Sequence, residues 1–160
     1  MNLNDRLLIV VGVDGSAASD HALAWTLRLA HRVDTAVEII TAWSPELDTP
    51  AGSPAMPLAD PVQAERVQRD CVERVLPGLS HPRSVAMQVV EGAPGPVLTE
   101  TARRADLLVL ASHGHRKLYT ILMGSTSEYC IRHGTCPVTV IPVPVHDPGA
   151  HPNAVATKPS

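Results

Sequence analysis

The sequence predicts an α/β fold: an open, doubly wound, five-stranded parallel sheet with helices on both faces. Two observations lead to this prediction. Short continuous apolar runs, which suit buried parallel strands, alternate with longer segments whose apolar residues recur at helical spacing. Turn residues separate the segments and give the order βαβαβαβαβ. We assume the Rossmann-like strand order 3-2-1-4-5, which is found in this class of folds.

The first half of the chain begins with an apolar strand over residues 7–13. A turn follows, and Ser16 is the expected N-cap of a helix over 17–31. The second strand covers 36–43. A Pro-rich loop at 44–61 comes next, because its prolines exclude a regular helix or a central strand.

The middle of the chain repeats the alternation. Helical spacing of apolar residues predicts a helix over 62–79, and a strand follows at 84–90. The next helix covers 94–105 and has a proline in its first turn, where a missing N–H costs nothing. A short apolar run at 107–110 is the fourth strand.

The last unit contains one helix and one strand. Gly124 and Ser125 open the helix, and Ser125 with Glu128 has the spacing of a capping box. Gly134 suits the end of this helix. The final strand covers 137–141.

Composition sets the limits of the domain. Residues 1–145 are expected to form one domain, and residues 146–160 a disordered tail that is rich in proline. A formal net charge of −3 without a basic run gives no indication of a nucleic-acid partner. No apolar run is long enough to cross a bilayer, and three cysteines without a C-x-x-C pair fit reduced thiols. We therefore expect a cytoplasmic protein that binds neither membrane nor nucleic acid.

The candidate binding site lies between the fourth strand and the last helix. A glycine at 114 lets the backbone come close to a ligand. Gly124 and Ser125, at a helix start, aim free N–H groups and the positive helix end at one point. This arrangement predicts an anion site, and phosphate is its usual occupant. Taken singly, each glycine is better explained as an ordinary turn or N-cap.

The spacing of these residues resembles a known signature. Residues 111–125 follow the pattern A-x2-G-x9-G-S, which resembles the ATP-binding signature G-x2-G-x9-G-(S/T) of the universal stress protein family. Ala111 stands in place of the first glycine. The flanking segments 106–109 and 136–138 also look like the family.

The resemblance implies a nucleotide-responsive regulatory or binding module in stress adaptation, with ATP as ligand and magnesium as an optional companion. It implies that adenosine lies against the ends of the first, second and fourth strands and that the phosphates lie at the last helix. It also implies a homodimer through strand 136–143. The residues that it assigns to the nucleotide are Gly12, Val13, Asp14, Ala42, Leu110, Ala111, Gly114, Gly124, Ser125 and Thr126.

Some alternatives stay open at this point. Asp14 is equally a turn or cap residue, and its residue type alone favours the cap. Ala111 is harmless if its φ is negative and strains the loop if its φ is positive. We assign no catalytic residue, because no Walker pattern and no Ser/His/Asp triad is present, and no metal, because His113-x-His115 lacks zinc-site spacing. A slow nucleotide hydrolase or transferase, an interaction module without nucleotide, and cyclic AMP or another adenine ligand remain alternatives.

Overall fold

The structure is a computed structural model, and it describes residues 7–45, 58–79, 82, 84–112 and 124–143. Gly114, most of the Pro-rich loop and the tail 146–160 lie outside the described residues. The elements in chain order are β1 (Leu8–Gly12), α1 (Ala17–Val33), β2 (Ala36–Trp43), α2 (Pro61–Val75), β3 (Ser84–Glu91), α3 (Pro94–Thr101), a 3₁₀ turn η1 (Ala102–Arg104), β4 (Leu107–Ala111), α4 (Ser125–His133) and β5 (Val138–Ile141).

The five strands form one parallel sheet in the order β3-β2-β1-β4-β5, which confirms the predicted fold. Element ends differ from the prediction most in three helices. The helix expected over 94–105 is α-helical only to Thr101 and continues as the 3₁₀ turn η1. Helix α1 extends beyond its predicted end to Val33. It ends there because Asp34 takes a left-handed conformation with a φ of 51° and donates its N–H to Ala30 O. Helix α2 ends at Val75, shortly before Gly78 with its φ of +88°.

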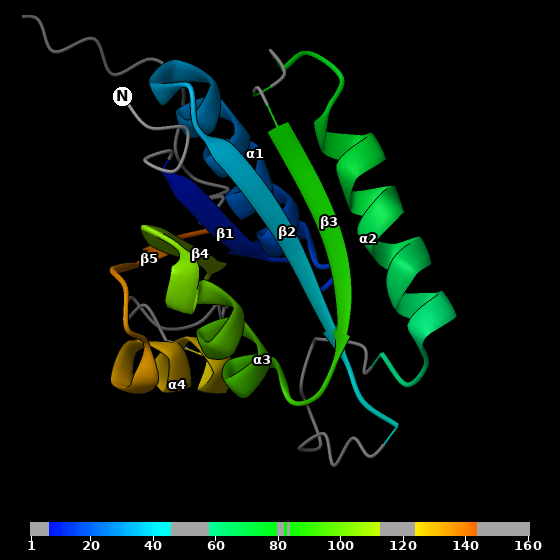
Figure 1. The fold of residues 1–160 in the computed structure, drawn as a ribbon. Coiled ribbons are helices and arrows are strands. Elements are labelled where there is room, and N and C mark those ends of the chain that lie inside the picture. The colour runs from blue at the N-terminus through cyan, green and yellow to red at the C-terminus, as the bar shows by residue number, and fades with distance from the viewer. Residues whose placement is uncertain (1–6, 46–57, 80–81, 83, 113–123, 144–160) are drawn as a thin grey trace, which may run out of the picture.

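Helices α1 and α2 cover one face of the sheet, and α3 and α4 cover the other (Figure 1). Because side chains alternate along a strand, each strand sends residues to both faces. Two separate apolar clusters result. The α1/α2 layer contains Ile9, Val11, Leu23, Leu27, Val37, Ile39 and Val109, and the α3/α4 layer contains Val10, Ile40, Val97, Leu98, Leu108, Leu110 and Cys130.

The α3 side of the sheet holds a buried charge. Glu38 on β2 is 4% exposed, and Arg104 Nη2 donates to its two carboxylate oxygens at 2.7 and 2.8 Å. The side-chain amide of Gln88 on β3 donates to the same carboxylate. These donors satisfy Glu38, since a buried carboxylate without partners would be strongly destabilising.

The cysteines form no disulfide, and Cys71 and Cys130 are buried. Burial raises the pKa of the Cys130 thiol to about 11, and the nearby Cys136 adds to this shift. Among the described helices, none combines the length and the apolar character needed to cross a membrane.

The Cys130 shift predicts a loss of stability at alkaline pH. The unfolded thiol ionises above its ordinary pKa of 9.0, whereas the folded thiol stays protonated up to about pH 11. The unfolded state is therefore favoured progressively across this window, by about 2 kcal/mol in total. Urea unfolding from pH 8 to 11 measures the slope, and Cys130→Ala should make it shallower. Equal slopes in the two proteins would contradict this account.

Candidate functional site

The carboxyl ends of β1 and β4 lie side by side at one edge of the sheet. These two strands pair with each other, with Val11 opposite Val109. The strand order therefore reverses between them, and this is where doubly wound sheets bind ligands. The family resemblance assigns predicted nucleotide contacts to the ends of both strands.

Gly12 and Leu110 meet on the α3/α4 side of this edge. A Cβ placed on Gly12 would lie 3.1 Å from Leu110 Cδ2 and 3.0 Å from Leu98 Cδ1. Glycine thus lets the end of β1 pack closely against both leucines. Sequence reasoning did not find Leu98, because a leucine in an amphipathic helix carries no signal beyond core packing.

The end of β2 continues this edge on the other side of β1. Val13 is buried and donates its N–H to Ile40 O at 2.9 Å, which extends the ladder past the end of β1. Ala42 lies two residues further along β2 and is half-buried. The backbone at the ends of β1 and β2 therefore forms one continuous stretch along the carboxyl edge of the sheet.

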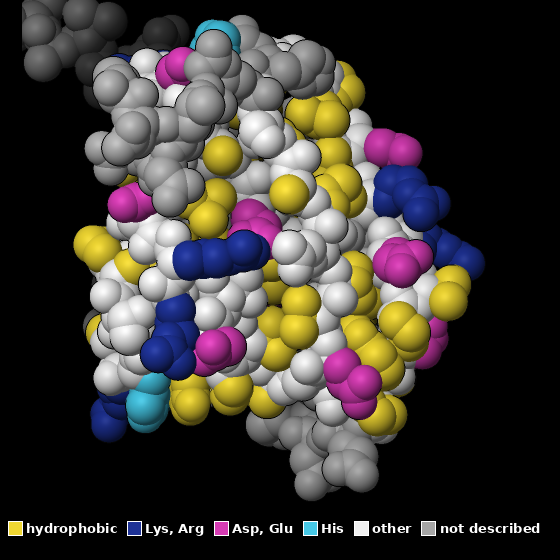
Figure 2. Space-filling view, in the orientation of Figure 1, with side chains coloured by type: hydrophobic (Ala, Val, Ile, Leu, Met, Phe, Trp, Pro, Cys, Tyr) yellow, Lys and Arg dark blue, Asp and Glu magenta, His cyan; other side chains and the backbone are white. Residues whose placement is uncertain are grey.

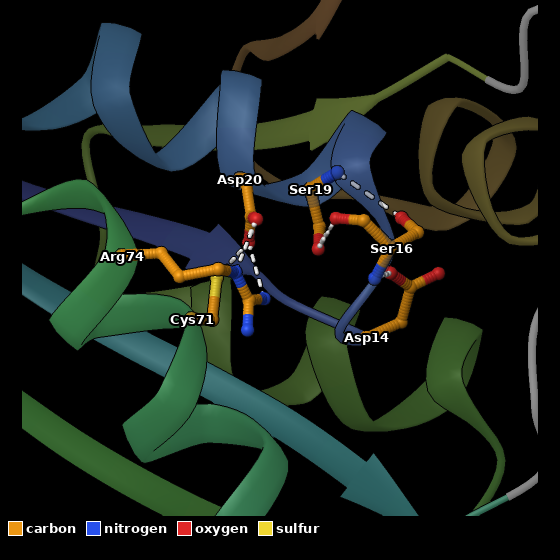
Figure 3. A network of polar contacts seen from close by, with 6 residues as sticks. All are labelled: Asp14, Ser16, Ser19, Asp20, Cys71 and Arg74. Carbon is orange, nitrogen blue, oxygen red and sulfur yellow. Dashed lines mark hydrogen bonds and ion pairs between the residues drawn. The ribbon is translucent and has the colours of Figure 1, made fainter.

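Asp14 makes a turn at the end of β1. Its Oδ1 accepts the N–H of Ser16 at 2.9 Å, and Ser16 Oγ in turn accepts the N–H of Ser19 at 3.1 Å (Figure 3). Ser16 is the N-cap of α1, as predicted, so Asp14 belongs to the turn and is not the cap. The second carboxylate oxygen of Asp14 points away from these contacts (Figure 3).

Helix α4 begins without a side-chain cap. Its N-cap is Gly124, a residue without a side chain that could accept a hydrogen bond from the helix. The expected capping box of Ser125 and Glu128 is therefore wrong. Ser125 is already helical, and the Glu128 side chain accepts from Arg132 at 2.8 Å instead. Without such a cap, the positive end of α4 lies beside exposed Ser125 and half-buried Thr126.

Two serines that the sequence did not single out tie α4 and β5 to the end of β4. Ser127 is buried, and its hydroxyl donates to Ala111 O at 3.5 Å. Ser112 donates its N–H to Ile141 O at 2.9 Å, and its Oγ accepts the N–H of Val143 at 3.3 Å. These bonds bring the start of α4 next to the last residue of β4.

The structure settles the question of Ala111 and leaves Gly114 unplaced. Ala111 is the last residue of β4, and Asp34 alone among the described non-glycine residues has a positive φ. The φ of Ala111 is therefore not positive, and the Cβ of Ala111 causes no backbone strain. Gly114, His113 and His115 lie outside the described residues.

Charges around the described part of the chain are mixed. On the face in Figure 2, basic and acidic side chains are interspersed and form no continuous basic patch. The described residues contain no group of three or more His, Cys, Asp or Glu side chains that could hold a metal ion. Cys130 is buried with its sulfur near Gly95 O, whereas His133 is exposed and stacks on Tyr129.

Comparison with known proteins adds a family and a set of similar folds. A profile of the Universal stress protein family matches residues 8–142. Universal stress protein Rv2005c of Mycobacterium tuberculosis is 30% identical over 155 residues, covering 88% of this chain and 52% of that protein. The chain thus spans about half the length of the curated relatives it matches.

Two solved structures share the fold. A universal stress protein in complex with cAMP has a TM-score of 0.65 and 24% identity, and the match covers 85% of this chain and 96% of that one. A universal stress protein from Archaeoglobus fulgidus in complex with dAMP has a TM-score of 0.60 and 17% identity, with 84% and 96% covered.

Proposed function

The chain belongs to the universal stress protein family, and on that basis we propose that it binds an adenine nucleotide at the carboxyl edge of β1 and β4. One observation carries the proposal: α4 begins at a glycine N-cap, with no side-chain cap, next to the end of β4, the strand that pairs with β1. A helix start of this kind attracts phosphate. Proteins of the same fold that were solved with cAMP and with dAMP support an adenine ligand.

The two ends of the ligand have different proposed contacts. The adenosine part lies against the ends of β1, β2 and β4, and the second carboxylate oxygen of Asp14 accepts a hydrogen bond from it. The phosphates lie at the start of α4, where backbone N–H groups and two hydroxyls can donate. The proposed contact residues are Gly12, Val13, Asp14, Ala42, Leu110, Ala111, Gly114, Gly124, Ser125 and Thr126.

Within this proposal the ligand is ATP, and magnesium is an optional companion of its phosphates. The protein then acts as a nucleotide-responsive binding module in stress adaptation, not as an enzyme. Its cytoplasmic location stays a prediction, and the free cysteines are in keeping with it.

Ser125→Glu tests the phosphate end directly. A carboxylate in the first turn of α4 interacts favourably with the helix dipole, so the fold should not suffer. The same charge repels phosphate, and the affinity for ATP should fall by about tenfold or more. Adenosine, which has no phosphate, should bind as it does to the wild type.

Calorimetric titration with ATP, ADP, cAMP and adenosine, with and without magnesium, measures these affinities. Ser125→Ala is the matched control, because it removes the hydroxyl without adding charge. Nucleotide released from the heated protein should be identified first. Equal ATP affinity in Ser125→Glu and wild type would place the phosphates elsewhere.

We also propose that two copies pair through the edge strand within residues 136–143, where the structure places β5. Leu108 and Ser112 donate to Pro137 O and Ile141 O, so alternate residues of β5 face β4. The backbone groups of Val140 then face outward. Val140→Pro removes one outward N–H and should shift a dimer to monomer in sedimentation, with circular dichroism unchanged. A wild-type monomer would refute this assembly.

A further inference from the structure

The turn from Asp14 to Ser16 is enclosed by helix α2 as well as by α1. Gly15 has a φ of +83°, and a Cβ placed on it would lie 2.4 Å from Val67 Cγ1. Val67 therefore packs directly on the backbone of this turn. The position of α2 consequently limits the positions that the turn can take.

One helical turn further on, the same two helices are joined by polar contacts (Figure 3). Asp20 lies four residues after Ser16, and Cys71 lies four residues after Val67. Four helical residues span about 6 Å. The Asp20 contacts are thus the nearest polar link between α1 and α2 that the structure shows beyond the turn itself.

Asp20 receives three hydrogen bonds from α2. Its Oδ1 accepts from the Cys71 thiol at 2.6 Å and from Arg74 Nη2 at 2.9 Å, and its Oδ2 accepts from Arg74 Nε at 2.7 Å. Two of these bonds form a fork between a guanidinium and a carboxylate, which fixes direction as well as distance. The Asp20 side chain is 22% exposed, so solvent screens the pair less than it would screen a fully exposed one.

The Cys71 thiol contributes as a donor and not as a nucleophile. It is fully buried, and burial, together with its hydrogen bond to Asp20, raises its pKa well above the ordinary range. The thiol therefore stays protonated at neutral pH, where thiolates carry the reactivity of cysteine. Its S–H group remains available to Asp20.

We propose that Asp20 is a positioning residue for Asp14. By holding Cys71 and Arg74, Asp20 keeps Val67 against Gly15, and the turn then presents the second carboxylate oxygen of Asp14 in one direction. This inference rests on the proposed nucleotide site and adds to it a residue outside the ligand's reach. Helix α2 keeps a second attachment, because Gln68 Nε2 donates to Ile39 O at 3.0 Å and to Gln88 O at 2.8 Å.

The proposal predicts which part of the ligand is affected. Asp14 lies at the adenosine end, and α4 lies at the phosphate end. Loss of the Asp20 contacts should therefore weaken adenosine and ATP by the same factor. Changes that act through such intermediate contacts typically alter affinity by about twofold to thirtyfold.

Asp20→Asn is the test, because asparagine keeps the shape and loses the charge. Titration with adenosine and with ATP should show equal losses within the range above. Arg74→Met, at a side chain that is 48% exposed, should give a loss in the same direction and secures the test if Asp20→Asn does not fold.

Two controls separate positioning from general destabilisation. Ile9→Val lowers stability by about 1 kcal/mol from the far end of β1 and should leave both affinities unchanged. Glu100→Gln removes an exposed ion pair between Glu100 on α3 and Arg103 on η1, and it should also leave both affinities unchanged. Unchanged adenosine and ATP affinities in Asp20→Asn and Arg74→Met would overturn the proposal. A wild-type protein that binds neither ligand would instead refute the nucleotide site itself.

Discussion

Gly15→Ala is expected to lower the free energy of unfolding by about 2–4 kcal/mol and the affinity for adenosine and ATP by about tenfold. Two effects together lower the free energy of unfolding. Alanine is strained at a φ of +83°, and its Cβ would lie 2.4 Å from Val67 Cγ1. The turn must then move away from α2, and Asp14 moves with it.

A double-mutant cycle with Val67→Ala separates the two effects. Truncating Val67 removes the overlapping methyl group, so in that background Gly15→Ala should cost only the backbone strain of about 1–2 kcal/mol. Urea unfolding of the four proteins gives the coupling. A cost for Gly15→Ala that is the same in both backgrounds would show that α2 does not restrict the turn.

Gly95→Ala is expected to destabilise the protein by about 2–3 kcal/mol and to remove most of the affinity that the phosphates add to adenosine. A Cβ on Gly95 would lie 2.7 Å from two ring carbons of Tyr129 and 3.0 Å from its Cβ. These atoms are close to the backbone of α4 and cannot move alone. Helix α4 must shift, and the start of α4 is where Ser125 and Thr126 lie.

The measurement compares ATP with adenosine in the wild type and in Gly95→Ala. The ratio of their affinities should approach one in the variant, whereas Gly15→Ala should leave that ratio nearly unchanged. Tyr129→Ala provides the matched background, in which Gly95→Ala should cost much less stability. A preserved ATP-to-adenosine ratio in Gly95→Ala would mean that α4 does not hold the phosphates.

Local patterns were sufficient to predict most of the fold. The apolar runs of the strands, the Ser16 N-cap and the proline at the start of α3 each act within a few residues, and the structure confirms them. The capping box failed for a local reason as well. Its spacing makes Ser125 the N-cap, but the helix begins one residue earlier than this pattern requires, with Gly124 as the N-cap.

Contacts between distant segments could not be predicted in this way. Asp20 and Arg74 are separated by 54 positions, and Gly95 and Tyr129 belong to different helices. An aspartate in the first turn of a helix already has a sufficient explanation in the helix dipole. Nothing in the sequence then indicates that this side chain also binds a neighbouring helix.

The separation of the core into an α1/α2 layer and an α3/α4 layer has a consequence for cooperativity. The turn at Asp14 is attached to the first layer, and the start of α4 is attached to the second. Each layer can then open locally with its own free energy while the sheet persists. A ligand that contacts both ends of the site is released when either layer opens. Occupancy of the site by such a ligand would therefore raise the free energies of local opening of both layers. The amide hydrogens of the two layers would then exchange as one unit.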